Sequence, residues 1–273
     1  VGVLVAGLGF TGKSLLEVLF GLGAFQIFHI VVGCLSLENK DRKILKQIKT
    51  AVLGKNVNFA QYKLWPMVSV LKFGGSSVAS ATNMSRVLDI VLKEAAKGKV
   101  VLISSAISGC TDALLSGGEE SLVAMETRHR DMVTRLFTGA EREKVQQRMD
   151  ALFAQLREAP AGEQVTYGEI LSTTILCAKL QAEGESAAWL DSRDLVVKED
   201  ERETFRRIKK AIEGTEAHIY VAPGFICRSR SSEVDTLGRG GSDYSAALYA
   251  AAIGADSLQI WTDVPGIMTA NPK

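Results

Sequence analysis

The chain has 273 residues, enough for one large domain or two small ones. Hydrophobic residues make up 47% of it and charged residues 23%, a composition that predicts a packed soluble core. The 32 basic and 31 acidic residues leave a net charge of +1, which argues against a broad polybasic surface for nucleic acid.

The first predicted elements form a partial β-α-β unit within residues 1–66. Residues 1–7 are apolar and β-branched, an amphipathic run follows to Phe20, and residues 28–35 read as a second strand. Residues 21–37 resemble a membrane span, but Gln26 and His29 interrupt them and they fall short of the ~20 apolar residues required. No signal peptide is supported, so we expect a cytoplasmic protein without a membrane partner.

The first loop fits two phosphate-binding patterns at once. Gly7, Gly9 and Gly12 spell the dinucleotide fingerprint G-x-G-x-x-G, and the same loop through Ser14 spells the P-loop G-x-x-x-x-G-K-S. The second strand lacks the acidic residue that a dinucleotide site requires, and no later aspartate completes a P-loop site before residue 66. We therefore assign residues 1–66 no chemistry and interpret them as an extension, or as sequence from outside the native reading frame.

Cysteine and histidine spacing predicts no metal site and no disulfide framework. The four cysteines lie far apart without a C-x-x-C pair, and the three histidines form no H-E-x-x-H motif. We interpret the cysteines as reduced thiols.

A new alternation of strands and helices begins after Trp65-Pro66. Strands are predicted at 68–73 and 99–106, a helix at 80–96 that ends near Gly98, and a long charged helical region at 119–157. The second half continues with a helix at 167–184, a strand at 186–192, a helix at 201–214, a strand at 217–226, a helix at 242–255 and a strand at 257–264.

This alternation predicts an α/β fold with a mostly parallel sheet that is covered on both faces. Ligands bind such sheets in the loops at the carboxyl ends of the strands. The loops after Phe73, Ile103, Ile226 and Thr262 are rich in Gly, Ser, Asp or Thr, and we expect them to form the site.

Two of these loops contain glycines beside charged residues. In "KFGGSS" (72–77), the glycines allow backbone amides to approach a phosphate, and Lys72 could neutralise a phosphoryl group; a plain glycine turn is the alternative. In "TLGRGGSDYSAA" (236–247), Arg239 offers a planar fork for a carboxylate. Asp243 at the helix start could instead be a simple cap.

Three further segments are candidates for binding. Glu169 lies in the first turn of a predicted helix, where a favourable interaction with the helix dipole is the alternative role. The hydroxyls of "SSAISGCTD" (104–112) could bind a small polar substrate. Asp263 follows the last strand, where it could contact ribose hydroxyls or stabilise the Pro-Gly turn.

These motifs together give the chain a close resemblance to the aspartokinases of the amino acid kinase family, from about Met67 to Lys273. The matching segments, in order, are "KFGGSSVA", "SAISGCTD", "YGEILST", "WLDSR", "PGF", "TLGRGGSDYSAA" and "TDVPGI". The resemblance implies a three-layer α/β/α sandwich of the carbamate kinase type. It also implies transfer of the ATP γ-phosphoryl group to the β-carboxylate of aspartate, the entry to lysine, threonine and methionine synthesis.

The resemblance also implies a role for each motif residue. Lys72 would bridge the phosphates, Asp243 would orient it, and Arg239 would hold a carboxylate of aspartate. The amino acid would be surrounded by Ser105, Thr111, Glu169, Phe225, Gly240, Gly241 and Ser242. ATP would be contacted by Gly74, Gly75, Ser76, Thr262, Asp263, Met268 and Lys273. Mg²⁺ would come with ATP, held mainly by its phosphates, and a homo-oligomer is expected.

The last motif departs from the family. Many aspartokinases have a tyrosine and Asp-Pro-Arg where this chain has Met268 and Asn271-Pro272-Lys273, which changes the expected nucleotide contacts. The chain starts at Val1 and stops within this motif, so we expect a fragment whose kinase domain is truncated at the carboxyl end and lacks regulatory ACT domains. Two alternatives stay open: an NAD(P)-dependent segment of the homoserine dehydrogenase type fused to a kinase, and a non-catalytic module that binds ATP or amino acids.

Overall fold

A computed structural model of the protein describes residues 67–262. The glycine patterns of residues 1–66 and the predicted nucleotide contacts Asp263, Met268 and Lys273 lie outside this range. No helix between residues 67 and 262 is long and apolar enough to cross a lipid bilayer.

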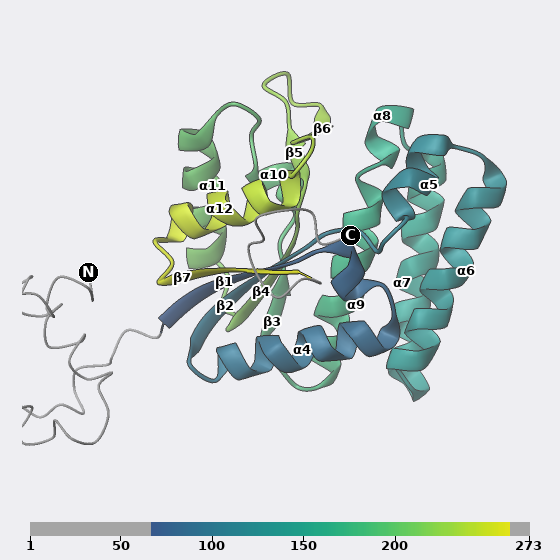
Figure 1. Cartoon of the computed structure of the whole chain (residues 1–273), viewed down its shortest axis with the longest axis horizontal. Helices are drawn as coiled ribbons and strands as arrows, with labels where there is room; N and C mark the ends of the chain where they lie inside the picture. The colour runs from purple at the N-terminus through teal and green to yellow at the C-terminus, as the bar shows by residue number, and fades with distance from the viewer. Residues whose placement is uncertain (1–66, 263–273) are drawn as a thin grey trace, which may run out of the picture. The chain divides into compact units, whose positions relative to one another are not determined.

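The described residues form a five-stranded sheet in the order β3-β4-β2-β1-β7 (Figure 1). Its strands are β1 (Met67–Phe73), β2 (Gly98–Ser104), β3 (Ala187–Trp189), β4 (Ile219–Pro223) and β7 (Ser257–Trp261). Every neighbouring pair is parallel, which confirms the predicted sheet.

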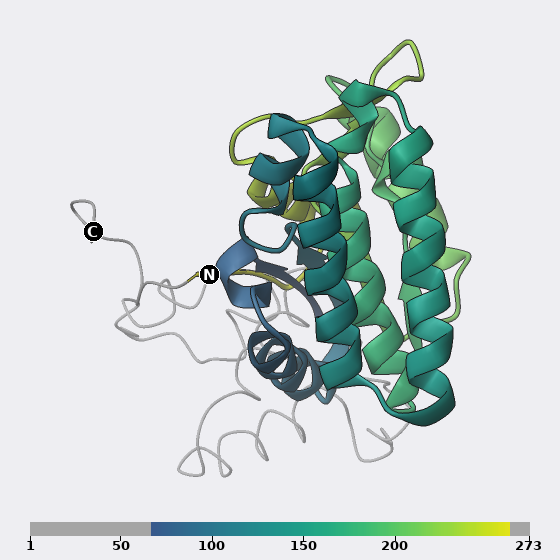
Figure 2. The same ribbon diagram turned by 90° about the vertical axis from the view of Figure 1, so that its right-hand side faces the viewer.

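Helices cover both faces of the sheet, which gives the three expected layers (Figures 1 and 2). One face is covered by α4 (Ala81–Ala95) and α9 (Tyr167–Ala182), with α6 (Glu119–Leu136) and α7 (Gly139–Glu158) packed beyond them. The other is covered by α10 (Ser192–Leu195), α11 (Glu201–Glu213) and α12 (Gly241–Ile253). Short helical segments are η3 (Gly75–Val78), α5 (Cys110–Ser116) and α8 (Ala161–Gln164).

Side chains of the central strands alternate between these two layers. On β2, Val100 and Leu102 pack toward α4 and α9, whereas Val101 and Ile103 pack toward α12. Because both faces are buried, residues 100–103 of β2 are a continuous apolar run, as the sequence of a central parallel strand should be.

The helix predicted at 80–96 is α4, and its capping residue explains its start. Ser80 accepts a hydrogen bond from the backbone N–H of Asn83 at 3.2 Å, which satisfies one of the helix's unpaired donors. Apolar residues at helical spacing, including Met84, Val87 and Val91, are buried on one face.

The helical region predicted at 119–157 is two helices packed side by side (Figure 2). The first ends at Leu136, where Phe137 becomes extended and buried. Gly139 then adopts a positive φ of 56° as α7 begins, a conformation that glycine adopts at little energetic cost. The sequence shows no signal of this boundary between α6 and α7, because charged residues continue through it.

The strand predicted at 217–226 was wrong at its carboxyl end. It ends at Pro223, because Phe225 adopts a left-handed φ of 68° that extended chain cannot continue through. Residues Ile226–Arg228 (β5) instead pair antiparallel with Val234–Thr236 (β6) in a separate hairpin. The informative loop therefore starts after Pro223 and not after Ile226.

Strand register places the ends of four strands side by side. Phe73 pairs with Ser104 and with Trp261, and Ser104 pairs with Pro223. The loops that follow these residues therefore meet at one edge of the sheet, where parallel α/β folds bind their ligands.

Candidate functional site

A cavity of about 630 Å³ opens at this edge of the sheet. Its lining includes eleven of the residues singled out from the sequence: Lys72, Gly75, Ser105, Thr111, Glu169, Phe225, Arg239, Gly240, Gly241, Ser242 and Asp243. Residues from five separate segments of the chain thus share one space.

Some predicted residues lie beside the cavity, and some lining residues were missed. Gly74 and Ser76 neighbour Gly75, and Thr262 follows β7, but none of the three is in the lining. The missed lining residues include Ser108, Asp112, Leu115, Val165, Thr236 and Gly238. Ser108 and Asp112 belong to the hydroxyl-rich segment at 104–112, so the motif contained a signal for them, whereas apolar Leu115 and Val165 offered none.

The central charged group is an ion pair between Lys72 and Asp243. Lys72 Nζ lies 2.7 Å from Asp243 Oδ1, and the two side chains are 12% and 54% exposed. Lys72 is the penultimate residue of β1, and Asp243 lies in the first turn of α12. Gly240 is the N-cap residue of α12, so Asp243 does not have the simple capping role considered from the sequence.

Gly75 lets two loops approach each other closely. A Cβ atom at this position would lie 2.8 Å from the carbonyl oxygen of Ala106 and 3.2 Å from the nitrogen of Ser108. Glycine is therefore required at position 75, because the neighbouring loop leaves no room for a side chain. The same glycine also allows the backbone to approach an anion closely.

The glycine-rich loop before α12 turns sharply into the cavity. Gly238 and Gly240 have φ values of 75° and 76°, which favour glycine. The backbone N–H groups of Asp243 and Tyr244 donate to the carbonyl of Gly240 as the helix begins. The amino-terminal turn of α12, with its partial positive charge, thus borders the same space as Lys72.

Phe225 adopts a strained conformation at the cavity wall. It has a φ of 68°, and its N–H donates to Ser245 Oγ at 3.0 Å. Its ring packs so closely on Gly241 that a Cβ there would lie 2.9 Å from Cδ2. Backbone strain in a residue that lines a cavity is typical of a functional position.

We expect Phe225→Gly to be more stable than Phe225→Ala by about 1 kcal/mol, because both variants lack the ring but only glycine relieves the positive φ. Urea unfolding of the two variants measures the difference. At an ordinary negative φ the order is reversed, so a more stable alanine variant would contradict the strain.

Glu169 is a buried carboxyl group in the first turn of α9. The residue is only 3% exposed, and its Oε2 has no hydrogen-bond partner within residues 67–262. Burial raises the pKa of Glu169 to about 8, although backbone hydrogen bonds from Ala106 and Glu169 itself act in the opposite direction. A buried carboxyl oxygen facing a cavity is suited to a cationic ligand group, which goes beyond the helix-dipole role.

Arg239 contrasts with Glu169, because it is exposed. It lines the cavity from the glycine-rich loop, and no hydrogen bond or ion pair within the described residues holds its guanidinium. A free planar fork that shares a cavity with a buried carboxyl group can bind a ligand that has both an acidic and a basic group.

The cavity fits a phosphate-bearing nucleotide better than a protein-held metal ion. Lys72, Gly75 and the start of α12 provide positive charge and a close backbone approach. Within residues 67–262, no group of three or more His, Cys, Asp or Glu side chains could hold a metal. A divalent ion that entered here would depend on oxygen atoms of the nucleotide.

Comparison with known proteins identifies the family. Residues 67–273 match the model of the amino acid kinase family. Lysine-sensitive aspartokinase 3 of Escherichia coli is 34% identical over 233 residues, which cover 76% of this chain and 51% of the relative. A bifunctional aspartokinase/homoserine dehydrogenase of Arabidopsis thaliana is 27% identical, with 96% of this chain and 32% of the relative covered.

Solved structures agree with this result. E. coli aspartokinase III in complex with aspartate and ADP is 31% identical, with a TM-score of 0.64, and the match covers 73% of this chain and 50% of that one. The same enzyme with lysine and aspartate gives a TM-score of 0.66. The chain thus spans about half the length of the E. coli enzyme and about a third of the Arabidopsis relative. Its fold, motifs and family match show that it belongs to the amino acid kinase family.

Proposed function

We propose that the protein transfers the γ-phosphoryl group of ATP to the β-carboxylate of L-aspartate and forms 4-phospho-L-aspartate. The observation that carries the proposal is the Lys72–Asp243 pair, which lies between two glycine loops in a cavity shared with Glu169 and Arg239. The similarity to an aspartokinase solved with aspartate and ADP supports it. The reaction would supply the synthesis of lysine, threonine and methionine.

On the phosphate side, Lys72 neutralises charge on the transferred group, and Asp243 holds the ammonium group in place at 2.7 Å. Gly75, with Gly74 and Ser76 beside it, provides the backbone cradle. Mg²⁺ bound to the ATP phosphates would neutralise further charge. The nucleotide contacts proposed for Thr262, Asp263, Met268 and Lys273 follow β7.

On the amino acid side, Arg239 binds the α-carboxylate and Glu169 accepts the α-ammonium group. Ser105, Thr111, Phe225, Gly240, Gly241 and Ser242 complete the wall around the substrate. The two charged residues fix the orientation of aspartate, so that its side chain points toward Lys72.

The reaction needs little general-base catalysis, because the acceptor carboxylate is already an anion. Catalysis is then a matter of bringing two anions together and neutralising their charge. This is consistent with a site that contains a lysine, an arginine and a helix amino terminus, and in which the buried Glu169 is mostly uncharged at pH 7 before substrate binds.

Trapping of the acyl phosphate with hydroxylamine tests the proposal. Purified protein with Mg-ATP should form hydroxamate with aspartate and not with glutamate or acetylglutamate. Absence of product from a folded protein that binds ATP would favour the non-catalytic module considered from the sequence.

Arg239→Ala should raise the KM for aspartate by about 10- to 100-fold, because a charge-assisted bidentate contact is lost. The value of kcat and the thermal stability should change little, since Arg239 has no partner within the described residues of the free protein. Initial rates of hydroxamate formation measure both parameters. Arg239→Lys keeps the charge without the fork, so it should recover only part of the affinity; an unchanged KM in both variants would contradict the role.

Homo-oligomer formation and a cytoplasmic location stay predictions. Size-exclusion chromatography with light scattering measures the former.

A further inference from the structure

A single arginine outside the cavity connects two of the loops that line it. Arg128 on α6 donates from Nη1 to the carbonyl oxygen of Ser108 at 2.6 Å, and from Nη2 to that of Ala79 at 2.8 Å. Ser108 belongs to the loop after β2, and Ala79 ends the glycine loop after β1. Two donors of one planar guanidinium thus hold two separate segments of backbone.

The two loops also contact each other directly. The N–H of Ser108 donates to the carbonyl of Gly75 at 3.2 Å, and the N–H of Ser105 donates to that of Phe73 at 3.1 Å. A Cβ on Gly75 would already be too close to Ala106. The space between the loops is therefore narrow, and a small displacement of either one changes the lining of the cavity.

Arg128 does not line the cavity, and within residues 67–262 it forms no ion pair with a carboxylate. It is half-buried, and the charge is solvated by backbone carbonyl groups. Its neighbour His129 adds no charge at pH 7, because burial lowers the pKa of the ring to about 4.

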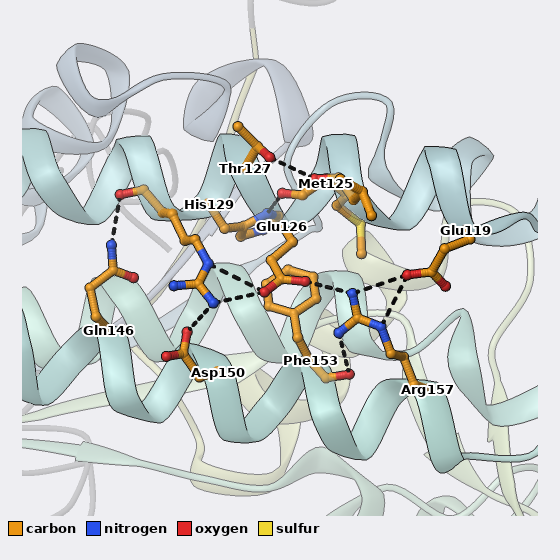
Figure 3. A network of polar contacts seen from close by, with 11 residues as sticks. Glu119, Met125, Glu126, Thr127, His129, Gln146, Asp150, Phe153 and Arg157 are labelled. Atoms are coloured by element: carbon orange, nitrogen blue, oxygen red, sulfur yellow. Dashed lines mark hydrogen bonds and ion pairs between the residues drawn. The ribbon is translucent and has the colours of Figure 1, made fainter.

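The helix that bears Arg128 is held firmly against α7 (Figure 3). Glu126 lies 2.6 Å from Arg157, and Arg130 lies 2.7 Å from Asp150. These pairs join the two helices on the side where His129 packs edge-on against Phe153. Arg128 therefore donates to the two loops from a helix that α7 holds in position.

We propose that Arg128 is a positioning residue that sets the spacing between the glycine loop after β1 and the loop after β2. The first is the proposed phosphate-binding loop, and the second is part of the proposed aspartate site. The inference rests on the proposed function, since it treats these loops as the two halves of a phosphoryl-transfer site. Reactants on the two loops must meet within a fraction of an ångström for efficient transfer, and a misplacement of about 1 Å can reduce a rate a hundredfold.

Hydrogen exchange combined with kinetics tests this role. In Arg128→Met, the backbone amides of Ser77 and Ser108, which donate within and between the loops, should exchange faster than in the unmodified protein. The kcat for aspartyl hydroxamate should fall about 10- to 100-fold, with calorimetric affinities for ADP and aspartate changed less than about threefold.

The two hydrogen bonds from Arg128 to the carbonyl groups of Ser108 and Ala79 are called the clamp below. Two further variants distinguish loss of the clamp from other causes of a change in exchange or in kcat. Arg128→Lys keeps the positive charge but lacks the planar fork, so it should resemble Arg128→Met more than the unmodified protein. Arg135→Met removes an arginine of the same helix whose described partner is Asp131 in an exposed ion pair, and it should change neither exchange nor kcat.

Unchanged exchange in both loops of Arg128→Met and Arg128→Lys would overturn the proposal, as would a lysine variant with full activity and normal exchange. Exchange reports on the clamp without any turnover. If the unmodified protein forms no hydroxamate but exchange still rises in these variants, the proposed function fails and the clamp between the loops stands.

Discussion

Lys72→Met is expected to lower kcat for phosphoryl transfer by about a thousandfold, with the KM for ATP changed less than tenfold. Charge accumulates on the transferred group in the transition state, and the Lys72 ammonium group is the cation placed to stabilise it. An interaction that strengthens in the transition state affects kcat more than binding. Initial rates of hydroxamate formation at varied ATP provide both values.

Loss of the fold does not explain this expected rate change. Asp243 is 54% exposed, so water can solvate its carboxylate when Lys72 is absent. A partly exposed ion pair contributes only about 0–1 kcal/mol to stability. Lys97→Met removes a lysine from an exposed pair with Glu94 and is the matched control. A Lys72→Met enzyme with turnover within a few-fold of the unmodified protein would refute the assignment.

Glu169→Gln is expected to weaken aspartate binding by about a hundredfold at pH 8, because the buried carboxylate that accepts the ammonium group becomes neutral. The unmodified protein should bind aspartate more tightly as pH rises toward 8, since Glu169 must ionise and its pKa is about 8. The change should be roughly tenfold per pH unit well below that value. Calorimetry in buffers of different ionisation enthalpy should detect the released proton.

The same substitution should stabilise the free protein in alkaline solution. Between pH 4.5, the ordinary pKa, and about 8, the folded state keeps a proton that the unfolded state has released. Stability of the unmodified protein therefore falls as pH rises through this window, and Glu169→Gln removes that dependence. We expect its Tm at pH 8 to be higher by roughly 3–8 °C.

Glu120→Gln provides the control for both effects, because Glu120 also lies in the first turn of a helix but is exposed. It should change neither aspartate affinity nor the pH dependence of Tm. Equal pH dependence in Glu169→Gln and the unmodified protein would show that another group titrates.

Local patterns were sufficient to predict most of the regular elements. The apolar run of β2 and the Ser80 cap with the helical spacing of α4 are properties of neighbouring residues, and both predictions are confirmed. The strand prediction was wrong after β4, where the backbone conformation of Phe225 interrupts the pattern. The helical region at 119–157 was predicted, but the break at Phe137 that divides it into α6 and α7 was not. Composition alone does not reveal such interruptions.

Periodicity and glycine-rich loops depend on residues close together in the chain, so the parallel α/β fold and the motifs of the amino acid kinase family could be predicted before the structure was known. How those motifs act on one another depends on the way distant segments pack. Three features of the site depend on segments that are distant in the sequence. They are the Lys72–Asp243 pair, the burial that raises the pKa of Glu169, and the hydrogen bonds from Arg128 to Ser108 and Ala79. Their charges and distances depend on strand register and helix packing, which no local pattern specifies.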